Sequence, residues 1–148
     1  MSVRTATDAA ALQERVVAFV RAFGLHRPGE TPCGKPIPVS EAHALLELAR
    51  DDGLTQSELG TRLRLEKSTI TRLMGQLLAR GWLERERHPS DRRAVLLHLT
   101  DRGLQAAVEI EKARRERFAS LVERIPAEDR DQVVRALGVL TEALDDEP

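Results

Sequence analysis

Residues 55–100 read TQSELGTRLRLEKSTITRLMGQLLARGWLERERHPSDRRAVLLHLT, and this stretch decides the fold. Thr55 is a good N-cap, and Glu58 follows three residues later, which is the pattern of a capping box at the start of a helix. A second helix is predicted to begin near Glu66 and to stop at Gly81. Two short helices joined by a tight turn indicate a helix-turn-helix.

The residues after Gly81 predict a β-hairpin. Two short strand-like runs, 82–87 and 94–99, flank the segment HPSDRR at 88–93. Proline, serine and aspartate favour a turn there, and the two arginines place positive charge at its tip. A helix-turn-helix followed by a basic wing is a shape for reading duplex DNA, so this stretch predicts a function as well as a fold.

The second helix of this stretch has one apolar face and one small, polar face. Four residues at helical spacing predict the buried side: Ile70, Leu73, Met74 and Leu77. The opposite side carries Ser68, Arg72, Gly75 and Ala79, with Thr71 and Gln76 at its edges. Small side chains let a helix enter a major groove about 12 Å wide, whereas a plain solvated face normally carries more Glu and Lys. We therefore favour a recognition helix, with an ordinary solvated face as the alternative.

The charge of the chain is distributed unevenly. The whole chain has a net charge of −1, but residues 55–102 carry ten basic against six acidic side chains. Positive charge is thus concentrated on the predicted DNA-binding stretch, and the flanking arms are acidic. Charged helices also show such fluctuations by chance, so charge supports the DNA hypothesis without deciding it.

Composition argues against several other classes of protein. No apolar run approaches the roughly 20 residues of a membrane helix, and the N-terminus lacks the apolar core of a signal peptide, so we expect a cytoplasmic protein with no membrane partner. The single cysteine leaves no internal disulfide. The four histidines are scattered, and the chain has no glycine-rich phosphate loop and no nucleophile–base pattern. We therefore expect no enzyme, no cofactor and no metal site.

Helices are predicted on both sides of the central stretch. The first is expected over about 8–23, and a long proline-rich loop follows it. The next is expected after the N-cap Ser40. Its core-facing residues are predicted to be Ala42, Leu45, Leu46 and Ala49. Thr100 caps a long helix that runs to about Arg124, and Pro126 fits the first turn of the last helix.

The first and last helices carry apolar stripes that the central module is too small to cover. The last helix has, at spacings of three and four, Val133, Val134, Leu137, Leu140 and Leu144. Two chains that pack these arms together bury both stripes, so we expect a homodimer. The alternative is that both arms fold back on their own domain. The expected fold is mainly α with a small two- or three-stranded β-wing. It comprises an N-terminal dimerisation arm and loop at 1–36, a winged helix-turn-helix at 37–100 and C-terminal dimerisation helices at 101–148.

The wing and the second helix of the central stretch together resemble a known family. Residues 91–103 read DRRAVLLHLTDRG, which is similar to the signature of the multiple-antibiotic-resistance regulator (MarR) family: Asp-x-Arg, then Leu-x-Leu-Thr and a glycine shortly after. Residues 67–73 (KSTITRL) look like that family's recognition-helix opening, and 80–83 (RGWL) like its turn into the wing. The helix order agrees over nearly the whole chain. The resemblance implies a homodimeric transcription factor, usually a repressor, with one recognition helix per subunit in the major groove and a wing tip in the adjacent minor groove.

Each candidate DNA contact has a role that its chemistry supports. Arg93, at the wing tip, suits a narrow, electronegative minor groove, and Asp91 is expected to hold its guanidinium in a salt bridge. Thr71 and Arg72 are best placed for base edges, with Gln76 on the edge of the same face. The remaining candidates are expected to contact phosphate: Lys67, Ser68, Thr69 and Arg92. Ordinary surface charge is the expectation for three other arginines: Arg62, Arg64 and Arg80.

An effector site is expected near the proline-rich loop and the helix after it. Many members of the resembled family release DNA when a small molecule, an oxidant or a metal acts near the junction of the arms and the DNA-binding domain. Cys33 and His43 are the candidates here, with His26 and Glu41 in the same region. Zinc-binding members also use histidines on the fifth helix, and oxidation-sensing members have a first-helix cysteine; this chain has neither. A redox- or metal-responsive sensor using Cys33, and a winged module that binds protein instead of DNA, are the alternatives.

Overall fold

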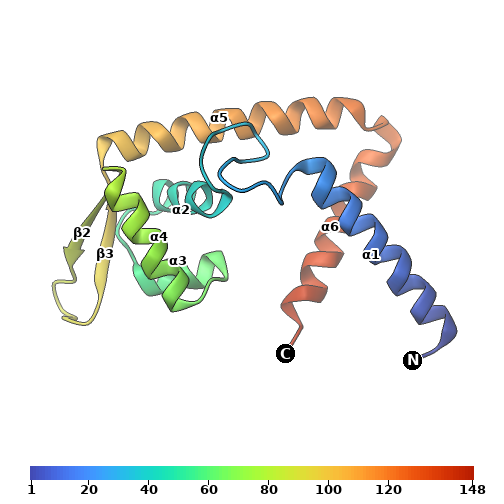
Figure 1. The fold of residues 1–148 in the computed structure, drawn as a ribbon, viewed down its shortest axis with the longest axis horizontal. Coiled ribbons are helices and arrows are strands. Elements are labelled where there is room, and N and C mark those ends of the chain that lie inside the picture. Colours follow the sequence, from blue (N-terminus) through green and yellow to red (C-terminus); the bar gives the residue numbers. More distant parts are fainter. The chain divides into compact units, whose positions relative to one another are not determined.

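The computed structural model describes all 148 residues and is mainly helical with one small sheet (Figure 1). In chain order the elements are α1 (Val3–Phe23), α2 (Val39–Arg50), β1 (Leu54–Thr55), α3 (Gln56–Leu63), α4 (Lys67–Ala79), β2 (Leu83–Arg87), β3 (Val95–Leu99), α5 (Asp101–Arg124), a 3₁₀ turn (Ala127–Asp129) and α6 (Arg130–Asp145). The chain divides into two compact units, 1–113 and 114–148. The expected fold class is confirmed, whereas the domain boundaries at 36 and 100 stay a prediction.

The sheet has three antiparallel strands in the order β1-β3-β2. The wing hairpin pairs Leu83 with Leu99 and Arg87 with Val95, so its two strands are in register along their full length. β1 adds a third strand by pairing Leu54 with Leu97. The sequence analysis did not locate β1, because two residues are too few to show an alternating pattern.

The hydrophobic core lies entirely within the winged module and the first turns of α5. It includes the predicted apolar face of α4, whose four residues are all at most 2% exposed. The buried apolar residues are Ile37, Ala42, Ala44, Leu45, Leu46, Leu48, Leu54, Leu59, Ile70, Leu73, Met74, Leu77, Leu83, Leu97, Ala107 and Ile110. Burial of this one face fixes which side of α4 is left in solvent.

Four expected details of the helices are wrong. α1 begins at Val3, five residues earlier than expected, because the Ser2 hydroxyl caps it by accepting from the Thr5 amide at 3.2 Å. α2 begins at Val39, so Ser40 lies in its first turn and caps nothing; Ala49 is exposed, and the core positions include Ala44 and Leu48 instead. The last break is a 3₁₀ turn that follows Pro126, and α6 starts only after it.

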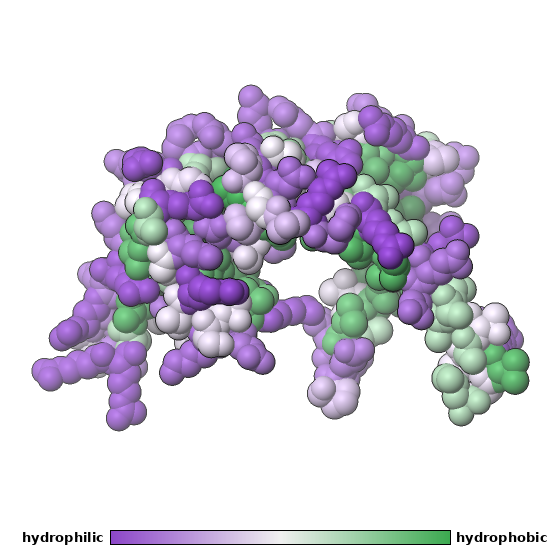
Figure 2. All heavy atoms as spheres, viewed as in Figure 1, coloured by the Kyte–Doolittle hydropathy of each residue, from purple (hydrophilic) through white to green (hydrophobic).

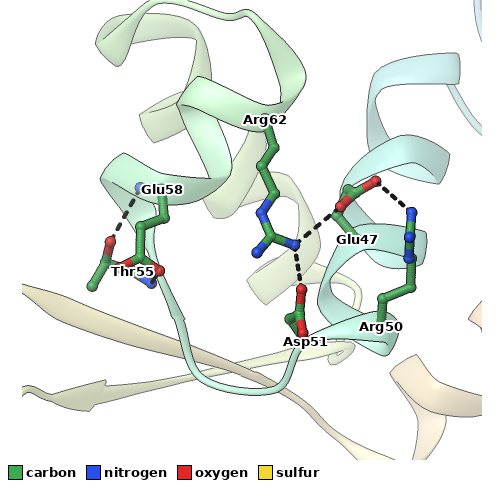
Figure 3. Close-up of polar contacts among 6 residues, drawn as sticks. All are labelled: Glu47, Arg50, Asp51, Thr55, Glu58 and Arg62. Atoms are coloured by element: carbon green, nitrogen blue, oxygen red, sulfur yellow. Dashed lines mark hydrogen bonds and ion pairs between the residues drawn. The ribbon is translucent and has the colours of Figure 1, made fainter.

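The first helix of the helix-turn-helix is held at both ends (Figure 3). At its start the predicted capping box is confirmed: the Glu58 amide donates to the Thr55 hydroxyl, and the Glu58 carboxylate accepts from the Thr55 amide. Near its end Arg62 pairs with Asp51 and, at 3.3 Å, with Glu47, both on or just after α2. Arg62 therefore links α3 to α2 through surface ion pairs, which agrees with the expectation that it is surface charge.

Arg80, at the end of α4, is also structural. Its guanidinium binds the Glu41 carboxylate through Nε to Oε1 at 2.8 Å and Nη2 to Oε2 at 3.3 Å, and it lies 4.9 Å from the centre of the Trp82 ring. The Glu41 side chain is only 2% exposed. A buried carboxylate needs such a partner, because an unpaired buried charge is strongly destabilising. Arg80 thus neutralises a charge inside the module, which corrects the expectation of ordinary surface charge.

The start of α5 packs closely against the backbone at the base of the wing. The Thr100 hydroxyl donates to the Gly81 carbonyl at 2.7 Å and accepts from the Gly103 amide at 3.1 Å, which confirms Thr100 as the cap. A Cβ atom on Gly103 would lie only 2.1 Å from the carbonyl oxygen of Trp82. Only glycine fits at this close approach of two backbones.

Gly103→Ala is therefore expected to destabilise the protein by about 3 kcal/mol or more, at the upper end of the usual cost of overpacking, because backbone atoms cannot move aside as a side chain can. Urea unfolding followed by circular dichroism measures the change. Gly75→Ala is the matched control, since a Cβ there meets nothing within 4 Å, and alanine raises stability by up to about 1 kcal/mol within a helix. Equal stability of the two variants would contradict the prediction.

The two terminal helices, each considered in its own unit, keep their apolar stripes uncovered. Neither α1 nor α6 has a buried residue. Leu12 and Phe19 on α1 are 51% and 45% exposed, and Leu137 and Leu144 on α6 are 49% and 52% exposed. Figure 2 shows apolar surface along both helices. None of the helices combines the length and the apolar character needed to cross a bilayer.

Candidate nucleic-acid interface

The predicted recognition face lies on the solvent side of α4. Its exposed residues are Lys67, Ser68, Thr71, Arg72, Gly75 and Gln76, and Thr69 is half-buried at the start of the helix. The N-cap Glu66 makes no side-chain capping bond. The first backbone N–H groups of α4 are consequently left to other acceptors, which is the usual way for a helix start to bind phosphate.

The hydrogen bonds of Thr71 define what it can offer to a base. Its hydroxyl donates to the Lys67 carbonyl at 2.9 Å, which uses its only proton. The Gln56 amide then donates to the same hydroxyl at 3.2 Å. Thr71 therefore presents a methyl group and an acceptor, but no donor, to a base edge. Gln56 was missed by the sequence analysis because the pair spans 15 residues and two helices.

The wing tip is held by its own hydrogen bonds. The His88 Nδ1 atom accepts from the amides of Ser90 and Asp91, both at 3.1 Å, and the Ala94 amide donates to the Asp91 carbonyl at 3.1 Å. The Asp91 carboxylate accepts from the backbone amide of Arg93 at 3.0 Å. The expected salt bridge to the Arg93 guanidinium is therefore wrong: Asp91 fixes the backbone of the turn. Arg93 remains exposed on an ordered tip.

A charged cluster braces the base of the wing. His98, on β3, contacts Asp52 Oδ1 through Nδ1 at 2.9 Å and Glu86 Oε2 through Nε2 at 2.7 Å. Carboxylates only accept, so both contacts are complete only when both ring nitrogens carry protons. The hydrogen bond to Asp52, followed by that to Glu86, raises the pKa of His98 above its ordinary value of 6.5. The cluster links the turn before β1 to both strands of the hairpin.

This cluster predicts a pH dependence of stability. Because the pKa of His98 is raised on folding, its contribution is fully present below about pH 6.5 and is lost as the pH rises through the folded pKa. His98→Gln should therefore remove part of the loss in unfolding free energy that wild type shows between about pH 6 and about pH 8. Urea unfolding of both proteins at the two pH values measures this. An unchanged pH dependence in the variant would show that the cluster contributes nothing.

Comparison with known proteins agrees with this geometry. The MarR family model matches residues 35–94. A helix-turn-helix-type transcriptional regulator of Mycobacterium leprae is 28% identical over 113 residues, covering 76% of this chain and 79% of the relative. The Bacillus subtilis transcriptional repressor YetL is 31% identical over 100 residues, covering 68% of this chain and 60% of YetL. The crystal structure of Streptococcus pneumoniae FabT in complex with DNA has the same fold, with a TM-score of 0.69, 21% identity and coverage of 98% and 99%.

Over residues 35–94 the chain is similar to the MarR family. The relatives named above are transcriptional regulators, and the family model covers the helix-turn-helix, β2 and the wing tip and ends just before β3. This similarity includes α4 and the wing tip, the segments on which the resemblance was drawn from the sequence.

The effector candidates are not on the recognition face of α4. Cys33 is half-buried in the loop between α1 and α2, and His43 is exposed on α2 between the buried Ala42 and Ala44. Glu41 is already bound to Arg80 and is not available as a ligand in this arrangement. No group of three or more His, Cys, Asp and Glu side chains is placed to hold a metal ion. An effector role for Cys33 and His43 stays a prediction.

Arg93→Ala is expected to weaken binding to the operator by about 1–3 kcal/mol, because the wing tip would lose the cation that is predicted to enter the minor groove. Thermal stability should stay nearly unchanged, since Arg93 is exposed. Asp91→Ala should act in the same direction but more weakly, by loosening the turn. Fluorescence anisotropy with labelled operator DNA measures both. Arg50→Ala, which removes the same charge from an exposed position on α2, is the control; equal losses for Arg50 and Arg93 would contradict the assignment.

Proposed function

We propose that the protein is a sequence-specific transcriptional regulator, acting as a repressor, that binds duplex DNA as a homodimer. The observation that carries the proposal is the pairing, in one compact unit, of an exposed small-residue helix face with an ordered arginine tip. The names of the relatives and the DNA complex of FabT support it. Such a regulator works in the cytoplasm, where bacterial DNA lies.

The dimer follows from the uncovered stripes of α1 and α6. Large exposed apolar patches mark interaction sites, and a second copy of the same chain can cover both stripes without any other partner protein. Two recognition helices then address one duplex, and they must approach the same side of it. The operator is therefore a pseudo-palindrome whose half-site centres lie about 10–10.5 base pairs apart.

The bound DNA is released, in this proposal, when a small-molecule effector binds near Cys33 and His43. What supports this is the family resemblance and the position of both residues outside the recognition face. A redox or metal response through Cys33 is the alternative form of the same control, and an effector screen that includes an oxidant and Zn²⁺ separates these forms.

A gel-shift titration tests the core of the proposal. The probe is the DNA upstream of the protein's own gene, and the control is unrelated DNA of the same length and base composition. We expect a single shifted species at nanomolar protein, with a footprint that is two-fold symmetric. Equal affinity for both DNAs, or a single asymmetric half-site in the footprint, would refute a symmetric sequence-specific regulator. No shift on any DNA would favour a protein-interaction module.

A further inference from the structure

A groove lies between the helix-turn-helix and the wing. Its volume is about 780 Å³. One wall is formed by α3 and the turn into α4, including Ser57, Thr61 and Arg64, and the other by the wing from Asp91 to Val95. Lys67 and Arg93 also line it. The groove thus joins the two surfaces to which DNA contacts were assigned above.

The geometry of duplex DNA determines what passes through such a groove. A major groove and the adjacent minor groove are separated by one sugar–phosphate strand. With α4 in the major groove and the wing tip in the minor groove, that strand has to run between them. The groove is the space between these two elements, and its occupant is therefore the phosphodiester backbone.

The side chains in the groove suit phosphate. Three cations line it: Arg64, Lys67 and Arg93. Asp91 is its one carboxylate, and that carboxylate already accepts from the Arg93 amide. The Thr61 hydroxyl donates to the Ser57 carbonyl at 3.2 Å, and Ser57 is itself an exposed residue of the lining. The groove is consequently positive, which favours a polyanion.

Arg64 stands out within this set because its backbone conformation is unfavourable for arginine. It ends α3 with φ 55° and ψ 40°, and it is the one non-glycine residue of the chain with positive φ. Glycine or asparagine adopts this left-handed conformation with less strain. Arg62, two residues earlier, has a structural role with Asp51 and Glu47, whereas the lining of the groove includes Arg64. A long cation at a position that favours glycine indicates a function for its charge.

We propose that this groove seats the phosphodiester strand between the two DNA grooves and that Arg64 contacts its phosphates. The proposal rests on the proposed function and adds a contact that the sequence analysis had assigned to ordinary surface charge. A phosphate contact positions the protein without reading bases. Arg64 therefore contributes equally to every DNA sequence, unlike Arg72 on the recognition face.

The test is the salt dependence of DNA affinity for Arg64→Gly, Arg64→Lys and wild type, measured by anisotropy on the operator and on unrelated DNA. In Arg64→Gly we expect the slope of log affinity against log salt to become shallower by about one per subunit, hence about two per dimer. The loss of affinity should be the same factor on both DNAs. Circular dichroism should show that the variant keeps the wild-type fold, since glycine adopts the left-handed conformation readily. Arg64→Lys keeps the charge and should keep the slope.

Arg62→Ala is the control on the same helix: it lowers the melting temperature but should leave the slope as in wild type. A wild-type slope in Arg64→Gly would overturn the proposal, and so would a loss of affinity confined to the operator, because that would indicate base readout. If wild type binds no DNA, the proposed function itself fails and this inference falls with it. If wild type binds and only the Arg64 result fails, the regulator stands and the groove assignment does not.

Discussion

The double substitution Leu137→Arg with Leu140→Arg is expected to abolish the folded dimer. The two residues belong to the apolar stripe of α6, where Leu137 is 49% exposed in the single chain. In the proposed dimer the partner covers this stripe, and two buried cations per subunit without counter-charges cost several kcal/mol each. The variant should be monomeric or unfolded by light scattering and circular dichroism, and it should bind operator DNA at least a hundredfold more weakly, because one recognition helix replaces two.

The control places two arginines on the same helix, away from the apolar stripe. Gln132→Arg with Glu142→Arg changes polar positions away from the stripe and should preserve both the dimer and DNA binding. The prediction depends on wild type being a dimer. A well-folded wild-type monomer at micromolar concentration would contradict it and favour arms that fold back on their own domain.

The second large effect is that of salt on DNA affinity. In the proposed complex, contacts from Lys67, Arg92 and the start of α4, doubled by the dimer, would neutralise six or more phosphates. Affinity should then fall by roughly a thousandfold or more between about 50 and about 200 mM salt, because binding releases condensed counterions. Anisotropy titrations across this range measure the slope. A slope near zero would indicate that the basic wing does not contact DNA.

The same titrations separate base readout from positioning. Arg72→Ala should lose discrimination at one symmetric pair of base positions, where a guanidinium suits the O6 and N7 atoms of guanine. Lys67→Ala should weaken all sequences alike and flatten the slope. If Arg72→Ala also weakens all sequences equally, its guanidinium contacts the backbone instead of a base.

Features that depend on neighbouring residues could be predicted from the sequence. The capping box at Thr55, the buried face of α4 and the cap at Thr100 all follow from spacings of three or four residues, and all are confirmed. The exposed recognition face followed automatically, since burying one side of a helix exposes the other. The wing could also be predicted from residues close together in the sequence, because a turn-forming segment between two short strands specifies a hairpin.

Features that depend on distant pairs could not be predicted. Nothing around Arg80 indicates that a carboxylate 39 positions earlier is buried against it, and nothing around Gln56 indicates its bond to Thr71. The predicted salt bridge from Asp91 to the Arg93 guanidinium was wrong for a different reason. Its spacing to Arg93 is compatible with a bond to the guanidinium or to the backbone amide, and only the folded turn distinguishes them. Long-range polar pairs are therefore where this sequence was least informative.

The hydrogen-bonded wing tip has a consequence for the kinetics of operator search. Because the turn from His88 to Ala94 is already ordered in the free chain, binding does not have to freeze a loose loop, and that entropic cost is absent. Encounter is then limited by diffusion and electrostatic attraction, which differ little between related operators. The residence time on each site, set by how fast the complex dissociates, carries the discrimination.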